Sequence, residues 1–234
     1  MLIFLDLETT GVEENDKIVS LGLLNADIKE YQYTLVNEGK KIAVEASSIH
    51  HITNEMIKEK PALKESEIYS YLQEYNKIEN ILVVHNSKFV LQRLENTGFV
   101  WQGSIIDTQR TTKHLIPECE LFSLQILRYE LRLYMQEEPL KKEYGIKDAL
   151  FAHHALSDAV VVELLLHYLE EMVSLEKMVS LSTQNVLLEK LNFGKYKGKY
   201  IEDLVQNDRA YLEWMLQSLS DLDDDLRYSI KYYL

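Results

Sequence analysis

The sequence predicts an α/β fold: a layered domain of strands and helices over residues 1–177, followed by a small, mainly helical domain over residues 184–234. Short apolar runs of strand length come first, and segments with helical periodicity are interleaved with them later, as in a sheet flanked by helices. Hydrophobic residues make up 46% of the 234 residues, which is enough to bury the core of one good-sized domain and a small appendage. The residue pattern changes after about Lys177, and we place the joint between the two domains at residues 180–183.

The first half of the chain supplies the predicted strands. An apolar run that ends at Asp6 has the composition of a buried strand, and so does a later run of four aliphatic residues. The polar residues 25–30 form the turn between two further strands. The predicted strands are Leu2–Leu5, Ile18–Ala26, Tyr31–Val36, Ile81–Val84 and Ser104–Ile106.

The second half of the chain supplies most of the predicted helices. Gly98 ends the helix that begins at Phe89, and Ser123 can cap the helix that follows it. The run Val160-Val161-Val162 suggests a strand, but the length of the segment and its continuing apolar stripe favour a helix. The predicted helices are Lys64–Tyr75, Phe89–Leu94, Thr108–Leu115, Leu124–Leu133 and Asp158–Val173, with C-terminal helices around Ile201–Leu204, Arg209–Leu219 and Leu222–Tyr232.

Composition and charge exclude several classes of protein. Asp6 and Glu8 interrupt the only early apolar stretch, so we expect no signal peptide. The best apolar run, residues 159–169, is broken by a glutamate and a histidine, so we expect no membrane contact. The single cysteine, Cys119, excludes an internal disulfide and a cysteine metal site. Together these features predict a soluble cytoplasmic protein.

The formal net charge of −13 argues against binding nucleic acid along a broad surface. Such affinity comes from neutralising phosphates, and proteins that rely on it are basic. An acidic enzyme can still act on nucleic acid where divalent ions meet the phosphate and the basic residues are local.

The segment Asp6-Leu7-Glu8 carries the first candidate site. Side chains two apart on a strand share one face, so both carboxylates point the same way just past a buried apolar run. They repel each other unless something positive lies between them, and oxygen ligands select Mg²⁺ or Mn²⁺. The alternative interpretation is a pair of solvated charges at the end of a strand. Thr9-Thr10-Gly11 then turns the chain away.

A second cluster lies in His153-His154-Ala155-Leu156-Ser157-Asp158. Asp158 falls in the first turn of the long predicted helix, and His153 precedes it and can face the same pocket. A histidine accepts a proton near neutral pH, so His153 suits the activation of a water molecule. Taken alone, His153 fits a partly exposed surface histidine better than a catalytic one.

These motifs resemble the DEDD superfamily of 3′–5′ exonucleases, in the branch that carries a catalytic histidine. The first family motif matches Asp6, Glu8, Thr9 and Gly11, and the third matches His153, Ala155, Asp158 and Ala159. Between them, the segment 49–53 resembles the loop over the 3′-terminal nucleotide, and the second motif matches His85, Asn86 and Phe89. The resemblance implies a ribonuclease H-like mixed sheet flanked by helices, with contacts to nucleic acid by Thr9, His50, Asn86 and Phe89.

One position departs from the family pattern. The second motif runs His-Asn-x-x-Phe-Asp, and this chain has His85-Asn86-Ser87-Lys88-Phe89-Val90. Val90 therefore stands at the position of a missing ligand, because valine cannot bind a metal ion.

The C-terminal segment Phe193-Gly194-Lys195-Tyr196-Lys197-Gly198-Lys199 resembles the tail of the exodeoxyribonuclease X-like members of the superfamily. Lys195, Lys197 and Lys199 can meet phosphates while the interleaved tyrosines stack on bases. A solvated charge run on a small structural domain explains the same residues equally well.

The resemblance implies a 3′–5′ exodeoxyribonuclease that releases nucleoside monophosphates in DNA repair or processing. Two Mg²⁺ or Mn²⁺ ions about 4 Å apart would serve the reaction. Asp6, Glu8 and Asp158 would hold the ion that positions the attacking water, and His153 would take its proton. The expected partners are single-stranded DNA or the 3′ ends of DNA, with RNA and the oligomeric state left open.

Val90 would weaken the binding of the second metal ion and so lower the activity. The alternatives are a non-catalytic module that binds 3′ ends, a polymerase proofreading subunit, or an exoribonuclease.

Overall fold

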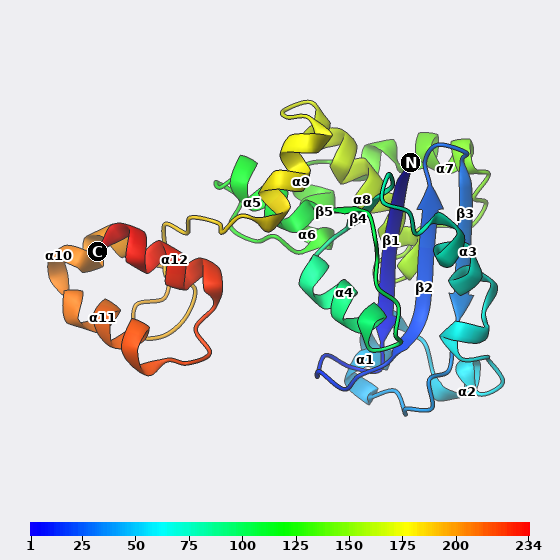
Figure 1. Cartoon of the computed structure of the whole chain (residues 1–234), viewed down its shortest axis with the longest axis horizontal. Helices are drawn as coiled ribbons and strands as arrows, with labels where there is room; N and C mark the ends of the chain where they lie inside the picture. The colour runs from blue at the N-terminus through cyan, green and yellow to red at the C-terminus, as the bar shows by residue number, and fades with distance from the viewer. The chain divides into compact units, whose positions relative to one another are not determined.

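The computed structural model describes all residues, Met1–Leu234, and the chain divides into two compact units, Met1–Ser182 and Thr183–Leu234. Figure 1 shows the elements of both units. The strands are β1 (Leu2–Thr9), β2 (Ile18–Asn25), β3 (Glu30–Leu35), β4 (Ile81–Val84) and β5 (Ser104–Asp107).

The helices up to residue 183 are α1 (Val44–His50), α2 (Asn54–Ile57), the 3-10 helix η1 (Leu63–Glu65), α3 (Glu67–Tyr75), α4 (Ser87–Glu95), α5 (Thr108–Leu115), α6 (Leu124–Glu130), the 3-10 helix η2 (Leu133–Gln136), α7 (Glu137–Tyr144), α8 (Ala155–Glu170) and α9 (Leu175–Thr183). The second unit continues with α10 (Ile201–Asn207), α11 (Arg209–Ser218) and α12 (Asp224–Tyr233). None of these helices has the length and apolar character needed to cross a membrane.

The strands form one mixed sheet in the order β3-β2-β1-β4-β5. β1 pairs with β2 antiparallel and with β4 parallel, so the first strand of the chain lies in the middle of the sheet. The pairing of β1 with β2 slips between Glu8 and Thr9, which marks the point where β1 leaves the regular ladder. The predicted ribonuclease H-like mixed sheet flanked by helices is therefore confirmed.

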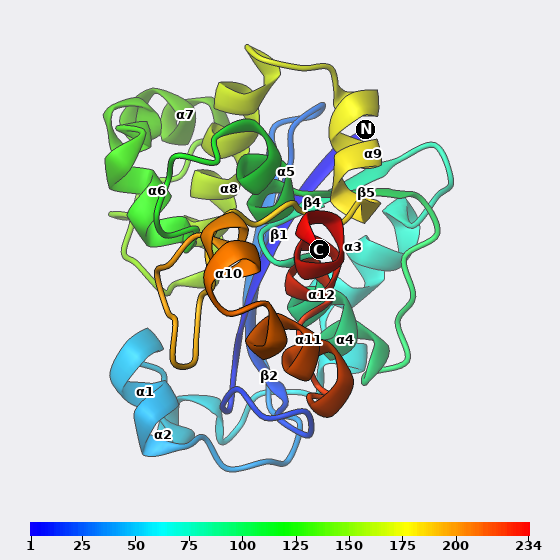
Figure 2. The same ribbon diagram turned by 90° about the vertical axis from the view of Figure 1, so that its left-hand side faces the viewer.

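The two faces of the sheet follow the alternation of side chains along β1. Phe4 packs into the cluster that contains the apolar side chains of α8. Ile3, Leu5 and Leu7 point the other way, into the cluster that contains side chains of α3 and α4. Figure 2 shows α6, α7 and α8 on one side of β1 and α3 and α4 on the other. Asp6 and Glu8 share the parity of Phe4 and so lie on the face of α8.

Helix α8 lies directly on the sheet because Gly22 has no side chain. A Cβ at Gly22 would lie 2.2 Å from the backbone nitrogen of Leu156, closer than any real contact. The valine run 160–162 is fully buried within α8, which confirms the helical prediction for that segment. An apolar helix covered on all sides can carry such a run, since burial outweighs the β preference of valine. The close approach fixes the first turn of α8 against β2 at Gly22, which pairs with Asp6 of β1.

The structure corrects one of the predicted helices. The helix predicted over residues 124–133 ends earlier, because α6 stops at Glu130 and Arg132 adopts a φ of 57° before η2 begins. The boundary between the two units lies between Ser182 and Thr183, within the joint predicted at residues 180–183, and these residues form the last turn of α9. Helices α1, α2 and α7 have no counterpart in the sequence prediction, because each is short and shows little apolar periodicity.

The second unit has a core of its own, which confirms the small, mainly helical C-terminal part. Its buried side chains come from α10, α11, α12 and the segment before them, and they are Leu191, Ile201, Leu204, Leu212, Met215, Leu222, Leu226 and Ile230. The chain before α10 folds back on itself, with an antiparallel bridge between Lys190 and Tyr200.

Candidate active site

Three carboxylates and an imidazole meet where the C-terminal end of β1 faces the first turn of α8. Asp6 and Glu8 project from β1 and are partly buried, whereas Asp158 is buried with 5% of its surface exposed. They share a cavity of about 270 Å³, whose lining is Asp6, Leu7, Glu8, His85, Ser123, Leu124, Gln125, His153 and Asp158. The structure thus brings together the four residues that the sequence assigned to one site.

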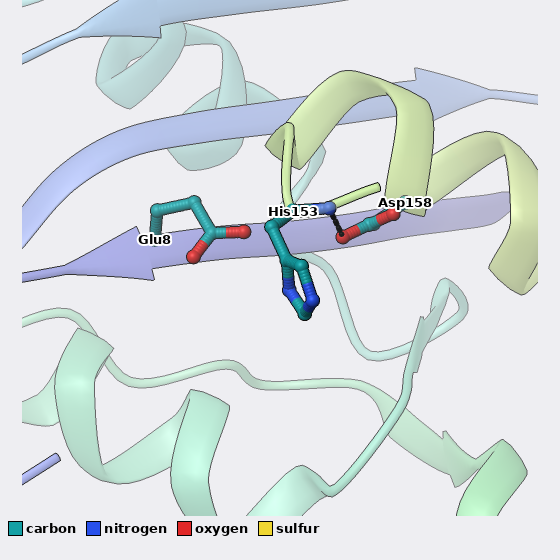
Figure 3. A group of neighbouring side chains, drawn as sticks. All are labelled: Glu8, His153 and Asp158. Atoms are coloured by element: carbon teal, nitrogen blue, oxygen red, sulfur yellow. Dashed lines mark hydrogen bonds between the residues drawn. The ribbon is translucent and has the colours of Figure 1, made fainter. Parts of the chain in front are cut away.

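The tightest part of this group is Glu8, His153 and Asp158, whose ligand atoms all lie within 4.8 Å of one another. Figure 3 shows Glu8 extending from β1 toward His153, with Asp158 of α8 on the other side of His153. The backbone N–H of His153 donates to Asp158 Oδ2 at 3.0 Å, which holds the histidine at the start of α8. Carboxylate oxygens and an imidazole at this spacing can hold a divalent cation.

The carboxylates of this site are poorly compensated in the absence of a cation. Burial, with repulsion from Asp158 and Glu8, raises the pKa of Asp6 well above its usual range. Burial and the charge of Asp158 raise the pKa of Glu8 to about 8. Burial also raises the pKa of Asp158 to about 7, against hydrogen bonds that favour the charged form. A cation between these groups would stabilise the charged carboxylates and so oppose the effects of burial and of mutual repulsion. The donor set therefore fits a divalent metal ion.

A chain of polar side chains behind Asp158 fixes its orientation. Gln125 Nε2 donates to Asp158 Oδ1 at 2.6 Å, and Arg128 Nη1 donates to Gln125 Oε1 at 3.2 Å. Arg128 is itself held by both carboxylate oxygens of Glu137, through Nη2 to Oε2 at 2.8 Å and Nε to Oε1 at 2.5 Å. Because arginine only donates, the oxygen of the Gln125 amide must face Arg128 and its NH₂ group must face Asp158.

The sequence analysis did not single out Gln125, Arg128 or Glu137. The available signal was the spacing of Gln125 and Arg128, three residues apart on one face of α6, where a polar pair beside buried leucines requires partners. Glu137 lies on α7, and only the tertiary fold brings it to Arg128.

His153 has the exposure and charge state expected of a proton acceptor. It is exposed, and its backbone has a φ of 58°, which turns the chain just before α8. Partial burial and the neighbouring charge of His51 lower the pKa of His153. The imidazole is therefore neutral at pH 7 and free to accept a proton.

The structure places Thr9 and His50 together at the end of β1. Thr9 is buried and its hydroxyl donates to the backbone oxygen of Gly11 at 2.6 Å. Both ring nitrogens of His50 are engaged: Ile52 N–H donates to Nδ1 at 3.0 Å, so Nε2 carries the hydrogen and donates to Thr9 O at 3.1 Å. His50 thereby fixes the backbone of Thr9, and its own contact with a nucleotide stays a prediction.

Asn86 and Phe89 lie at the start of α4. Asn86 is exposed and adopts a φ of 66°, and its N–H donates to Asp107 Oδ1 at 3.2 Å. The neighbouring N–H of Ser87 donates to Asp107 Oδ2 at 2.7 Å, so one buried carboxylate sets the course of this loop. Phe89 is partly exposed, and the guanidinium of Arg93 lies 4.7 Å from the centre of its ring.

Val90 is buried in the apolar cluster on the α3 and α4 side of the sheet, with 2% of its surface exposed. It does not line the cavity that contains Asp6, Glu8 and Asp158. Leu7 belongs both to that cluster and to the cavity wall, so the two regions meet there. The side chain at position 90 therefore contributes to the core in this protein.

The three predicted lysines belong to the second unit, and they differ in their surroundings. Lys195 Nζ lies 3.5 Å from Asp208 Oδ2 and 4.5 Å from the centre of the Tyr196 ring. Lys197 and Lys199 are exposed, and neither forms an ion pair.

Comparison with known structures defines the class of this fold. The structure described as "Exonuclease X in complex with 5′ overhanging duplex DNA" covers 78% of this chain and 99% of that chain, with a TM-score of 0.61 and 24% sequence identity. Most of this chain therefore has the fold of that exonuclease. The family model described as "Exonuclease" matches residues 3–165, and this chain belongs to that family.

Matches to the second unit and to the whole chain give a more specific relationship than the fold does. A family model described as "Exodeoxyribonuclease X-like C-terminal" matches residues 191–220. "Exodeoxyribonuclease 10" of Escherichia coli (strain K12) is 26% identical over 237 residues, covering 100% of this chain and 99% of the relative. "DNA polymerase III PolC-type" of Thermotoga maritima is 27% identical over 221 residues, covering 89% of this chain but only 15% of the polymerase. The predicted resemblance to exodeoxyribonuclease X-like exonucleases is confirmed.

Proposed function

We propose that this protein is a 3′–5′ exodeoxyribonuclease that hydrolyses the terminal phosphodiester of a DNA strand and releases a nucleoside monophosphate. The observation that carries the proposal is the convergence of Asp6, Glu8 and Asp158 on one cavity beside His153. Membership of the exonuclease family supports the reaction. The relative named as an exodeoxyribonuclease, similar over its full length, supports DNA as the substrate.

The proposed metal ligands are Asp6, Glu8 and Asp158. Hard oxygen donors of this kind favour Mg²⁺ or Mn²⁺, and the raised pKa values of all three carboxyl groups are consistent with an electrostatic need for a cation. A divalent ion bound there would stabilise charge on the phosphate and acidify a bound water. Gln125 and Arg128 hold Asp158 so that its carboxylate keeps one orientation toward the cavity.

His153 is the proposed general base. Its imidazole is exposed at the cavity and neutral at pH 7, so it can take the proton of the water that attacks the phosphorus. The hydrogen bond from its backbone N–H to Asp158 ties its position to that of a metal ligand. A shift of Asp158 would therefore displace the proposed base as well.

Thr9, His50, Asn86 and Phe89 are the proposed contacts to the terminal nucleotide. Asn86 follows His85, which lines the cavity, and Phe89 lies in the first turn of α4, so an exposed amide and a partly exposed ring can meet a sugar and a base there. Thr9 would contribute its backbone at the end of β1, in the position that His50 fixes.

Val90 favours a second candidate function, a module that binds 3′ ends without cleaving them. The proposed enzyme uses two ions, and with valine at position 90 the second has Asp6 as its main protein ligand. Loss of one ligand that costs about 4 kcal/mol in the transition state lowers the rate about a thousandfold. The cavity, its carboxylates and His153 are nevertheless intact, which favours the enzyme.

The test is nucleotide release from single-stranded DNA labelled at its 5′ end, with Mg²⁺ or Mn²⁺. The proposal predicts a ladder of strands shortened from the 3′ end by the unmodified protein and none by Asp158→Asn. Binding of the strand without any shortening, in either metal, would contradict the enzyme and support the binding module. Equal shortening by Asp158→Asn would show that the activity comes from elsewhere.

A further inference from the structure

The segment of residues 190–200, which we call the lysine loop, is the one strongly basic stretch of an acidic chain. It contains four lysines and no acidic residue, whereas the whole chain has a net charge of −13. Three of these lysines are exposed and without an ion pair: Lys190, Lys197 and Lys199. A local basic surface on an acidic protein concentrates attraction for a polyanion at one place.

The fourth lysine holds the loop in place instead. Lys195 lies over the ring of Tyr196, and both groups meet the carboxylate of Asp208, with Tyr196 Oη donating to Oδ2 at 2.7 Å. The Tyr196 ring packs edge-on against Tyr211 at 5.0 Å between centroids. The contact with Asp208 neutralises Lys195, so the charge available to a ligand comes from the other three lysines.

Backbone hydrogen bonds make the loop a defined surface. Leu191 N–H donates to Lys199 O at 3.0 Å, and Gly198 N–H donates to Leu191 O at 2.7 Å. Gly194 and Gly198 adopt φ values of 76° and 81°, which residues with side chains rarely reach. A preformed loop loses little freedom on binding, so its lysines are set in position before a ligand arrives.

Exposed aromatic rings accompany the unpaired lysines. Phe193 and Tyr200 lie in the loop and expose 41% and 47% of their surfaces. Lys190 Nζ lies 4.7 Å from the centre of the Tyr200 ring, so a cation and a stacking surface are adjacent. Interleaved lysines and rings match the repeat of single-stranded nucleic acid, in which phosphates alternate with unpaired bases.

We propose that the second unit carries a binding site for single-stranded nucleic acid, in which Lys190, Lys197 and Lys199 contact phosphates and Phe193 and Tyr200 stack on bases. This site goes beyond the proposed exonuclease function, because it contains none of the residues of the cavity at Asp158. Binding at the lysine loop requires neither a metal ion nor hydrolysis. A second binding site on the same chain would raise the effective concentration of a strand near the first unit.

The experiment measures binding of a labelled oligothymidylate to the full chain by fluorescence anisotropy, in EDTA and over a series of salt concentrations. EDTA keeps hydrolysis out of the measurement, so failure of this site and failure of the exonuclease are separate results. The test variant is Lys190→Gln/Lys197→Gln/Lys199→Gln. The matched control is Lys142→Gln/Lys147→Gln/Lys177→Gln, which removes the same charge from exposed positions of the first unit.

The test variant should bind about tenfold more weakly at low salt. The slope of log Kd against the logarithm of the salt concentration should fall by about 0.7 for each phosphate that a lysine no longer neutralises. For the three substitutions together the slope should fall by about 2. The control should change neither quantity. Phe193→Ala/Tyr200→Ala should weaken binding by about tenfold for each stacked base and leave the salt dependence unchanged.

Two outcomes would overturn the proposal. An unchanged Kd and salt dependence in the lysine variant would exclude a nucleic-acid-binding site at the lysine loop. An unchanged Kd in the aromatic variant would exclude stacking on unpaired bases and therefore selectivity for single strands. Thermal unfolding of each variant shows whether the second unit stays folded. If the aromatic variant unfolds, Phe193→Leu/Tyr200→Leu keeps the apolar bulk and provides the same comparison.

Discussion

Replacing Glu8 with glutamine should stabilise the metal-free protein at alkaline pH. The carboxyl group of Glu8 is partly buried beside Asp158, and both effects raise its pKa from 4.5 to about 8. A raised pKa means that the folded protein holds this proton more tightly than the unfolded chain does. The stability that this proton contributes is therefore complete below about pH 4.5 and is lost as the pH rises through about 8.

The magnitude follows from the size of that rise. A rise of about 3.5 in pKa, at about 1.36 kcal/mol for each pH unit, corresponds to about 5 kcal/mol between pH 4.5 and 8. Part of this energy is repulsion shared with Asp158, so we expect roughly 3–5 kcal/mol to be relieved by Glu8→Gln. At about 2–4 °C for each kcal/mol in a unit of this size, the variant should melt roughly 6–20 °C above the unmodified protein at pH 8.5.

The assay is thermal unfolding of both proteins in EDTA from pH 4.5 to pH 8.5. Glu74→Gln removes an exposed acid from α3 and serves as the control. The two curves should coincide near pH 4.5 and separate as the pH rises, with the control following the unmodified protein. Addition of Mn²⁺ should stabilise the unmodified protein and the control more than Glu8→Gln, because a ligand stabilises only the state that binds it. Parallel pH curves for Glu8→Gln and the unmodified protein in EDTA would refute the reasoning.

Four further predictions concern nucleotide release from a labelled single strand. Gln125→Leu removes the hydrogen bond that orients Asp158, so it should lower the rate or the Mn²⁺ affinity about 10- to 100-fold, and an unchanged rate together with an unchanged Mn²⁺ titration would exclude this role. His153→Ala should lower the rate about 10²- to 10⁴-fold while strand binding in EDTA stays the same. In the unmodified protein, protonation of His153 ends its role as proton acceptor and lowers the rate. This fall in rate should occur below pH 6.5, because the pKa of His153 is lowered from that value. Val90→Asp should raise the rate and lower the melting temperature, since the new carboxylate enters an apolar cluster, and a rate equal to that of the unmodified protein would show that Val90 is harmless.

The sequence predicted each half of the candidate site because the geometry within each half is local. Asp6 and Glu8 share a face through the two-residue period of a strand, and Asp158 falls in the first turn of a helix that the length and the apolar stripe of its segment predict. The approach of α8 to the sheet depends on Gly22 of β2, and no pattern in the sequence indicates which backbone lies against a glycine.

The residues that support the site could not be predicted in the same way. Gln125, Arg128 and Glu137 come from α6 and α7, and their alignment behind Asp158 exists only after those helices pack against α8. His50 illustrates the same limit: its two hydrogen bonds depend on a tight turn at the end of α1, where His51 adopts a φ of 61°. Left-handed conformations of residues other than glycine leave little trace in a sequence.

The most direct test is the anomalous scattering of a crystal soaked in Mn²⁺. A metal ion bonded to carboxylate oxygens of Glu8 and Asp158, with Asp6 beside it and the imidazole of His153 facing it, is the expected result. A Mn²⁺ ion bound elsewhere on a protein that shortens DNA strands, with this cavity empty, would contradict the central claim.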